Sequence, residues 1–161
     1  MDDRSRVAQQ LGRPPRAFRR VARRCPFDRP AVTEQAPFDD DGAPFPTTYY
    51  LTCRRLVGEL ARLEAAGGVE RWSAALREDA ALAASRAWAD GEQRRIRRAL
   101  AGGREHPSLD LGVAGAGRDG SLKCLHAHAA FALAVPGYEL GERILAEVEP
   151  LWPERCCSDP G

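Results

Sequence analysis

The hydrophobic and polar positions in the first third of the chain predict three short strands. Residues 18–25 alternate apolar side chains with Arg, residues 31–36 read AVTEQA, and residues 47–53 read TTYYLTC. The last of these is rich in the β-branched and aromatic side chains typical of strands. Because the connections between the segments are short, we expect an antiparallel sheet in which the first and third strands run parallel.

After residue 53 the apolar period changes to that of a helix. Leu56, Val57, Leu60 and Leu63 form one apolar stripe, which Gly67–Gly68 ends. Further helices are predicted over residues 3–11, 69–101 (one helix or two), 121–134 and 138–148. The Arg-rich stretch 92–98 is expected on an exposed helix face. The fold class is therefore α+β, with a small three-stranded antiparallel sheet near the N-terminus packed against four to five helices.

Composition and charge then limit the class of protein. The 161 residues are 43% hydrophobic and 29% charged, as in a globular protein, and the net charge is +1. We expect a flexible basic arm over residues 1–17, one globular domain over 18–157 and a tail over 158–161. The near-zero net charge gives no general attraction to nucleic acid or to an anionic membrane. With no apolar stretch of membrane-spanning length and no signal-peptide core, we expect a cytoplasmic protein.

A glycine-rich segment over residues 102–120 precedes the predicted helix 121–134. Its final part and the residues that follow it offer backbone N–H groups together with Arg118, Ser121 and Lys123 just before a helix N-terminus. Such positions bind anions and phosphates. One hypothesis is therefore an enzyme or binding protein for a phosphorylated small molecule at residues 112–123, although neither the P-loop nor the dinucleotide-binding fingerprint is present. The alternative is a loop whose glycines have no chemical role.

Five cysteines are the second chemical signal. Their odd number and irregular spacing argue against a disulfide framework and leave thiols for a metal or for catalysis. Cys25 and Cys53 end the first and third strands, which places them at one edge of the predicted sheet. Zinc takes about four thiolate or imidazole ligands, and an iron–sulfur cluster takes mostly cysteine. We expect a composite metal site of Cys25, Cys53, Cys124 and one of His126, Cys156 or Cys157. Zinc is the preferred metal, and an iron–sulfur cluster is the alternative. The competing interpretation is that the thiols are buried and chemically inert.

The segment KCLHAHAAFALA (residues 123–134) also has the residues of a nucleophilic cysteine with a histidine base. On a helix, Cys124 and His128 share one face at i, i+4, whereas His126 points elsewhere. A thiol in a first helical turn beside Lys123 has the setting of a nucleophile, with His128 as its base. A buried structural helix with a packed histidine is the alternative.

Three segments, RRCPFDRPAVTEQAP, PFPTTYYLTC and KCLHAHAAFALA, resemble a bacterial family known as domain of unknown function 501. The resemblance runs from about Val21 to Cys157, and the Cys-Cys-Ser-Asp-Pro-Gly ending is similar to its actinobacterial branch. The resemblance implies no established activity. Genes of the family typically lie near those for a septum formation initiator, which suggests a third hypothesis, a non-catalytic partner of cell-division proteins. The resemblance also implies that His126 is a ligand and His128 a supporting neighbour. Relatives often carry a cysteine at the position of Phe27, so the Cys156–Cys157 pair is a candidate substitute.

Overall fold

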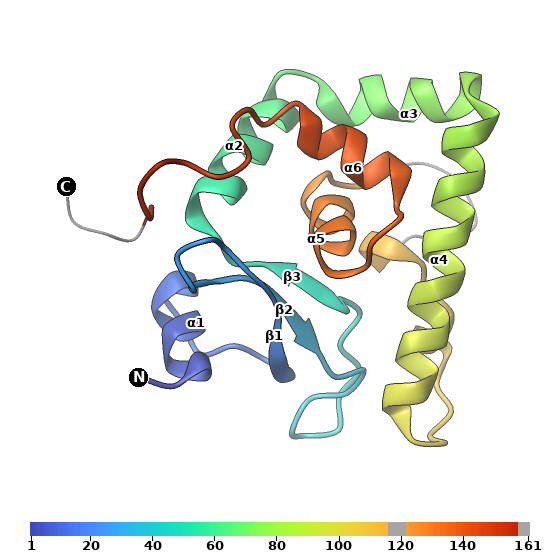
Figure 1. Ribbon diagram of the computed structural model, residues 1–161. Coiled ribbons are helices and arrows are strands. Elements are labelled where there is room, and N and C mark those ends of the chain that lie inside the picture. The colour runs from blue at the N-terminus through green and yellow to red at the C-terminus, as the bar shows by residue number, and fades with distance from the viewer. Residues whose placement is uncertain (116–121, 158–161) are drawn as a thin grey trace.

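The computed structural model describes residues 1–115 and 122–157, which form a three-stranded sheet and six α-helices (Figure 1). The sheet contains β1 (Phe18–Arg24), β2 (Pro30–Gln35) and β3 (Tyr49–Leu51). The helices are α1 (Asp3–Leu11), α2 (Arg54–Ala65), α3 (Gly68–Glu78), α4 (Ala80–Ala101), α5 (His126–Ala134) and α6 (Glu139–Ala146). Two short 3₁₀ helices, η1 (Pro107–Asp110) and η2 (Val113–Gly115), follow α4. The predicted α+β class is confirmed.

The sheet has the order β1-β2-β3 with both pairs antiparallel, so β1 and β3 run in the same direction. Val32 of the central strand pairs with Arg23 of β1 and Leu51 of β3. Every residue of β2 is buried, because α1 packs against β1 and β2 while α5 also packs against the sheet, mainly against β3. The predicted basic arm contains α1, whose Val7 is fully buried.

Helix α5 lies at the centre of the molecule, where the sheet, α2 and α6 pack against it (Figure 1). Five consecutive residues, from His128 to Ala132, are buried, which fits a helix that is apolar on almost all sides. Helix α6 approaches it closely at Gly141. A Cβ atom built on Gly141 would lie 2.6 Å from the Cβ of Ala132 and 2.6 Å from the carbonyl oxygen of His128. Glycine is therefore required at this crossing.

Two sequence-based predictions differ from the structure. Helix α5 begins at His126 rather than near residue 121, so Cys124 precedes the helix instead of lying in its first turn. The exposed face expected for residues 92–98 is also partly wrong, because Gln93 and Arg97 are buried. Within the two described ranges, no helix has the length and apolarity needed to cross a membrane.

Candidate functional site

Four of the five cysteines line one small cavity at the end of the sheet. Cys25 follows β1, Cys53 precedes the first residue of α2, and Cys156 and Cys157 come from the C-terminal segment. Gln10, Phe27, Arg29, Pro30, Trp152 and Pro153 complete the lining. The cavity volume is about 10 Å³, close to the space that one water molecule or a single ion requires.

Local structure explains how these thiols come together. After β1 the chain turns tightly, with the Cys25 amide donating to the Arg29 carbonyl over 2.9 Å. The chain leaves β3 directly into α2, which places Cys53 at the same end of the sheet. Arg55, in the first turn of α2, donates to the carbonyl oxygens of Leu151 (2.7 Å) and Pro150. These bonds hold the C-terminal segment, and with it Cys156 and Cys157, against the start of α2.

Two of the thiols are in contact. The Sγ atoms of Cys53 and Cys157 lie 3.9 Å apart. Cys53 is 5% exposed, Cys156 is also buried, and Cys157 is exposed. Burial, together with the neighbouring Cys157 thiol, raises the pKa of Cys53 to about 11. Without a nearby cation, Cys53 is therefore a neutral thiol at physiological pH.

The ligand set expected from the sequence is divided between two places. Cys25, Cys53, Cys156 and Cys157 share the thiol cavity, whereas Cys124 and His126 line a second cavity of about 310 Å³ beside β3. In the part of the chain that the structure describes, no group of three or more His, Cys, Asp or Glu side chains is already arranged to hold a metal ion.

His126 is occupied by contacts with α2. Its Nδ1 lies 2.9 Å from Oε1 of Glu64, and its Nε2 lies 3.1 Å from the carbonyl oxygen of Val57. Both ring nitrogens are therefore directed at oxygen atoms of α2. The same Glu64 oxygen accepts from the Leu125 amide at 2.7 Å. His126 and Glu64 therefore join α2 to the start of α5.

The surroundings of Cys124 and His128 differ from those predicted for an activated thiol and its base. Burial raises the pKa of the Cys124 thiol, and it outweighs backbone hydrogen bonds from Ala127 and His126 that act in the opposite direction. His128 is fully buried, and its Nδ1 lies 2.7 Å from the hydroxyl of Tyr138. Burial, with a smaller effect of Arg86, lowers the pKa of His128 to about 3. It is consequently a neutral core histidine.

Only one of the three expected anion-binding residues can be placed. Arg118 and Ser121 lie outside the described residues. Lys123 is exposed, and its Nζ donates to the carbonyl oxygen of Gly115 over 3.4 Å. Gly115 also lines the second cavity, which is otherwise formed mainly by apolar and aromatic residues of β3 and the segments around it.

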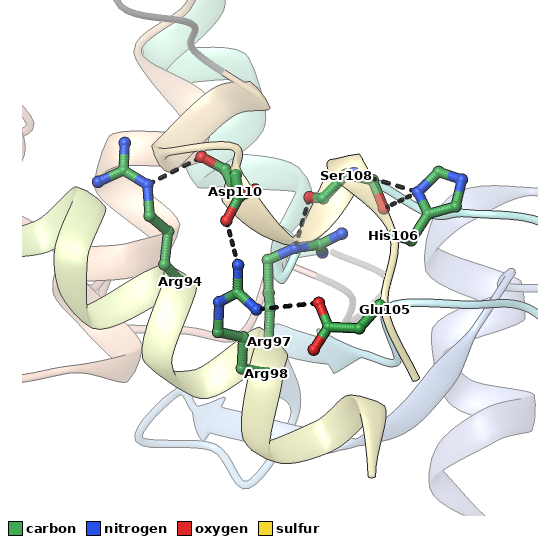
Figure 2. A network of polar contacts seen from close by, with 7 residues as sticks. All are labelled: Arg94, Arg97, Arg98, Glu105, His106, Ser108 and Asp110. Carbon is green, nitrogen blue, oxygen red and sulfur yellow. Dashed lines mark hydrogen bonds and ion pairs between the residues drawn. The ribbon is translucent and has the colours of Figure 1, made fainter. Parts of the chain in front are cut away.

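Polar side chains of α4 form hydrogen bonds with the segment that follows this helix, which the sequence analysis did not predict. Figure 2 shows Arg94, Arg97 and Arg98 reaching from α4 to the segment that follows it. Arg97, which is 0% exposed, donates to the Ser108 carbonyl at 3.3 Å and the Thr48 hydroxyl at 3.4 Å; Arg94 donates to the Asp110 carbonyl at 2.8 Å. The signal in the sequence is a stripe that mixes polar with apolar residues: Leu82, Arg86, Ala89, Gln93 and Arg97. Of these contacts, the hydrogen bonds of Gln93, Arg94 and Arg97 hold the segment after α4 against the helix.

The fold and its cavities define an α+β protein with a cysteine-lined cavity at one end of its sheet. The chain belongs to the family described as proteins of unknown function DUF501, whose pattern matches residues 21–146. The matched span contains Cys25, Cys53 and Cys124 and ends before Cys156 and Cys157. No curated protein and no solved structure matches the chain.

Proposed function

We propose that the protein binds one zinc ion at the thiol cavity through Cys25, Cys53, Cys156 and Cys157. The observation that carries this proposal is the distance of 3.9 Å between the Sγ atoms of Cys53 and Cys157. Two sulfurs bound to one tetrahedral zinc at a Zn–S distance of about 2.3 Å are about 3.8 Å apart. The pair thus has the separation that two ligands of one ion require, and the other two cysteines line the same cavity.

Completing the ligand set requires Cys25 and Cys156 to move, because the four sulfurs are not grouped around one point. Zinc would stabilise the thiolate of Cys53, opposing the effect of burial on its pKa. Arg29 lines the cavity and would offset the negative charge of a four-thiolate site. A volume of about 10 Å³ favours a single ion over an iron–sulfur cluster, which is larger.

The proposed role of the ion is structural. Four thiolates would fill the coordination shell of zinc and leave no position for a substrate or a water molecule. The ion would connect the β1–β2 turn, the start of α2 and the C-terminal segment. The last two are already joined by the contacts of Arg55 and Cys53.

Metal analysis of protein purified without oxygen tests this function. We expect about one zinc per chain, lost on Cys53→Ser or Cys157→Ser. Cys124→Ser is the matched control, because Cys124 lies in the other cavity, and it should retain the zinc. Failure of the reduced wild-type chain to bind stoichiometric zinc after addition of the metal would contradict the proposal.

A second candidate is binding of a phosphorylated small molecule beside Gly115. It is favoured by the cavity of about 310 Å³, a size suited to a small ligand, and by Lys123, whose ammonium group contacts the Gly115 carbonyl. Thermal-shift measurements with phosphate, nucleotides and polyphosphate should then show stabilisation that Lys123→Met removes. Equal shifts in both proteins, or none in the wild type, would eliminate this candidate.

A further inference from the structure

The contact between Cys53 and Cys157 joins two thiols that are 104 positions apart in the sequence. Their sulfurs would have to approach by about 2 Å to form a bond of disulfide length, which is about 2.05 Å. Cys53 is fixed and buried at the start of α2, whereas Cys157 is exposed. The pair therefore joins an exposed cysteine to a buried one at short range.

We propose that Cys53 and Cys157 form a reversible disulfide, which makes the thiol cavity a redox-controlled site. The disulfide itself requires only the two thiols. Its consequence for zinc rests on the function proposed above, because the same two sulfurs cannot serve as thiolate ligands while they are bonded to each other. Oxidation would then release the ion, and reduction would restore its site.

The competing disulfide between Cys156 and Cys157 is disfavoured by geometry. Consecutive Cα atoms lie about 3.8 Å apart across a trans peptide bond, whereas disulfides usually join Cα atoms separated by about 4.4 to 6.8 Å. A bond between neighbours is therefore strained. The contact with Cys53 offers Cys157 a partner without this restraint, and the bonds from Arg55 to the 150–151 carbonyls keep the C-terminal segment close.

The oxidant we assign is a low-molecular-weight disulfide, such as oxidised glutathione. The Cys157 thiolate attacks one of its sulfurs, which forms a mixed disulfide and expels one small thiolate. The Cys53 sulfur, after losing its proton to the departing thiolate or to solvent, then attacks Sγ of Cys157. This second step forms the protein disulfide and releases the second small thiol. Two protein thiols are oxidised and one small disulfide is reduced to two thiols.

The test uses the full chain, reduced and stripped of metal, in buffers of graded oxidised-to-reduced glutathione ratio. Alkylation and peptide mass spectrometry should show that two thiols are lost together, that the Cys53 and Cys157 peptides become cross-linked, and that dithiothreitol reverses the change. Cys157→Ser should abolish the cross-link, while Cys25→Ser and Cys124→Ser should retain it. Because Cys157 is exposed, its replacement leaves the core intact, so this variant remains informative if Cys53→Ser fails to fold.

Three results would overturn the disulfide: a different pairing, a glutathione adduct on Cys157 that does not resolve, or five thiols that persist under oxidising conditions. A second arm oxidises zinc-loaded protein in the presence of a chromogenic chelator and should release about one zinc per disulfide formed. A chain that forms the disulfide but binds no zinc in either state refutes the zinc function alone. Disulfide formation with zinc retained refutes the control of zinc by oxidation.

Discussion

His128 is held neutral inside the protein by burial. Its ring lies beside Tyr138, and the nearby Arg86 adds a positive charge that further disfavours protonation. In the unfolded chain the same imidazole takes up a proton below a pKa of about 6.5. The folded state, with a pKa of about 3, does not bind that proton over most of this interval. Lowering the pH from 6.5 therefore favours the unfolded chain.

This difference predicts an acid sensitivity that depends on one residue. Between pH 6.5 and pH 4, the free energy of unfolding of the wild type should fall by up to about 1.4 kcal/mol per pH unit more than that of His128→Asn. Asn places a polar group near Tyr138 but does not titrate. Urea unfolding at a series of pH values measures the effect. Tyr138→Phe keeps the titrating ring and should keep the slope; equal slopes in the wild type and His128→Asn would contradict the assignment.

For individual residues, the sequence identified candidate cysteines and histidines but not their surroundings in the fold. Cys124 beside Lys123 has the pattern of an activated thiol, yet burial raises its pKa. His126 has the pattern of a ligand, yet Glu64 and Val57 occupy both of its nitrogens. These partners lie 62 and 69 positions away in the sequence, so no local pattern contains them.

Helix α6 rests on α5 through a backbone contact at Gly141. A methyl group at this position would lie 2.6 Å from the His128 carbonyl oxygen and from the Ala132 side chain, too close for either to remain in place. Gly58, inside α2, has no other group within 4 Å of the equivalent position. The two glycines therefore differ in their surroundings while both lie within helices.

The same substitution should consequently have opposite effects at these two sites. Gly141→Ala should destabilise the protein by about 1 to 3 kcal/mol through overpacking. Gly58→Ala should stabilise it by about 0.5 to 1 kcal/mol, because alanine is the better helix former. Thermal and chemical unfolding of both variants would check this. A destabilised Gly58→Ala together with a tolerated Gly141→Ala would show that the α5–α6 packing is not as described.

At the element scale, apolar periodicity predicted the strands and most helices within a few residues, including α2 with its stripe that contains Leu56 and Leu60. It failed where polar contacts between distant segments decide the structure. Helix α5 begins late because Glu64 of α2 accepts the Leu125 amide at its start. Helix α4 buries Gln93 and Arg97 because both donate to carbonyl groups of the following segment.

For the molecule as a whole, the cysteine-lined cavity depends on the sheet order and on the course of the C-terminal segment. The parallel direction of β1 and β3 could be predicted from the short connections, and it brings Cys25 and Cys53 to one end of the sheet. The arrival of Cys156 and Cys157 could not, because it depends on Arg55 binding the carbonyls of residues 150 and 151. Cys124 does not line this cavity, because it belongs to the lining of the other cavity, beside β3.

We propose that the four thiols of this cavity bind one metal ion. Anaerobic titration of the reduced, metal-free chain with cobalt(II) tests it most directly, because a tetrahedral cobalt–thiolate site has characteristic ligand-field and charge-transfer absorption. We predict saturation at about one cobalt per chain, displacement by zinc, weaker charge-transfer absorption in Cys157→Ser and an unchanged spectrum in Cys124→Ser. Absence of the tetrahedral thiolate bands, or their loss in Cys124→Ser, would show that these four cysteines do not form the metal site.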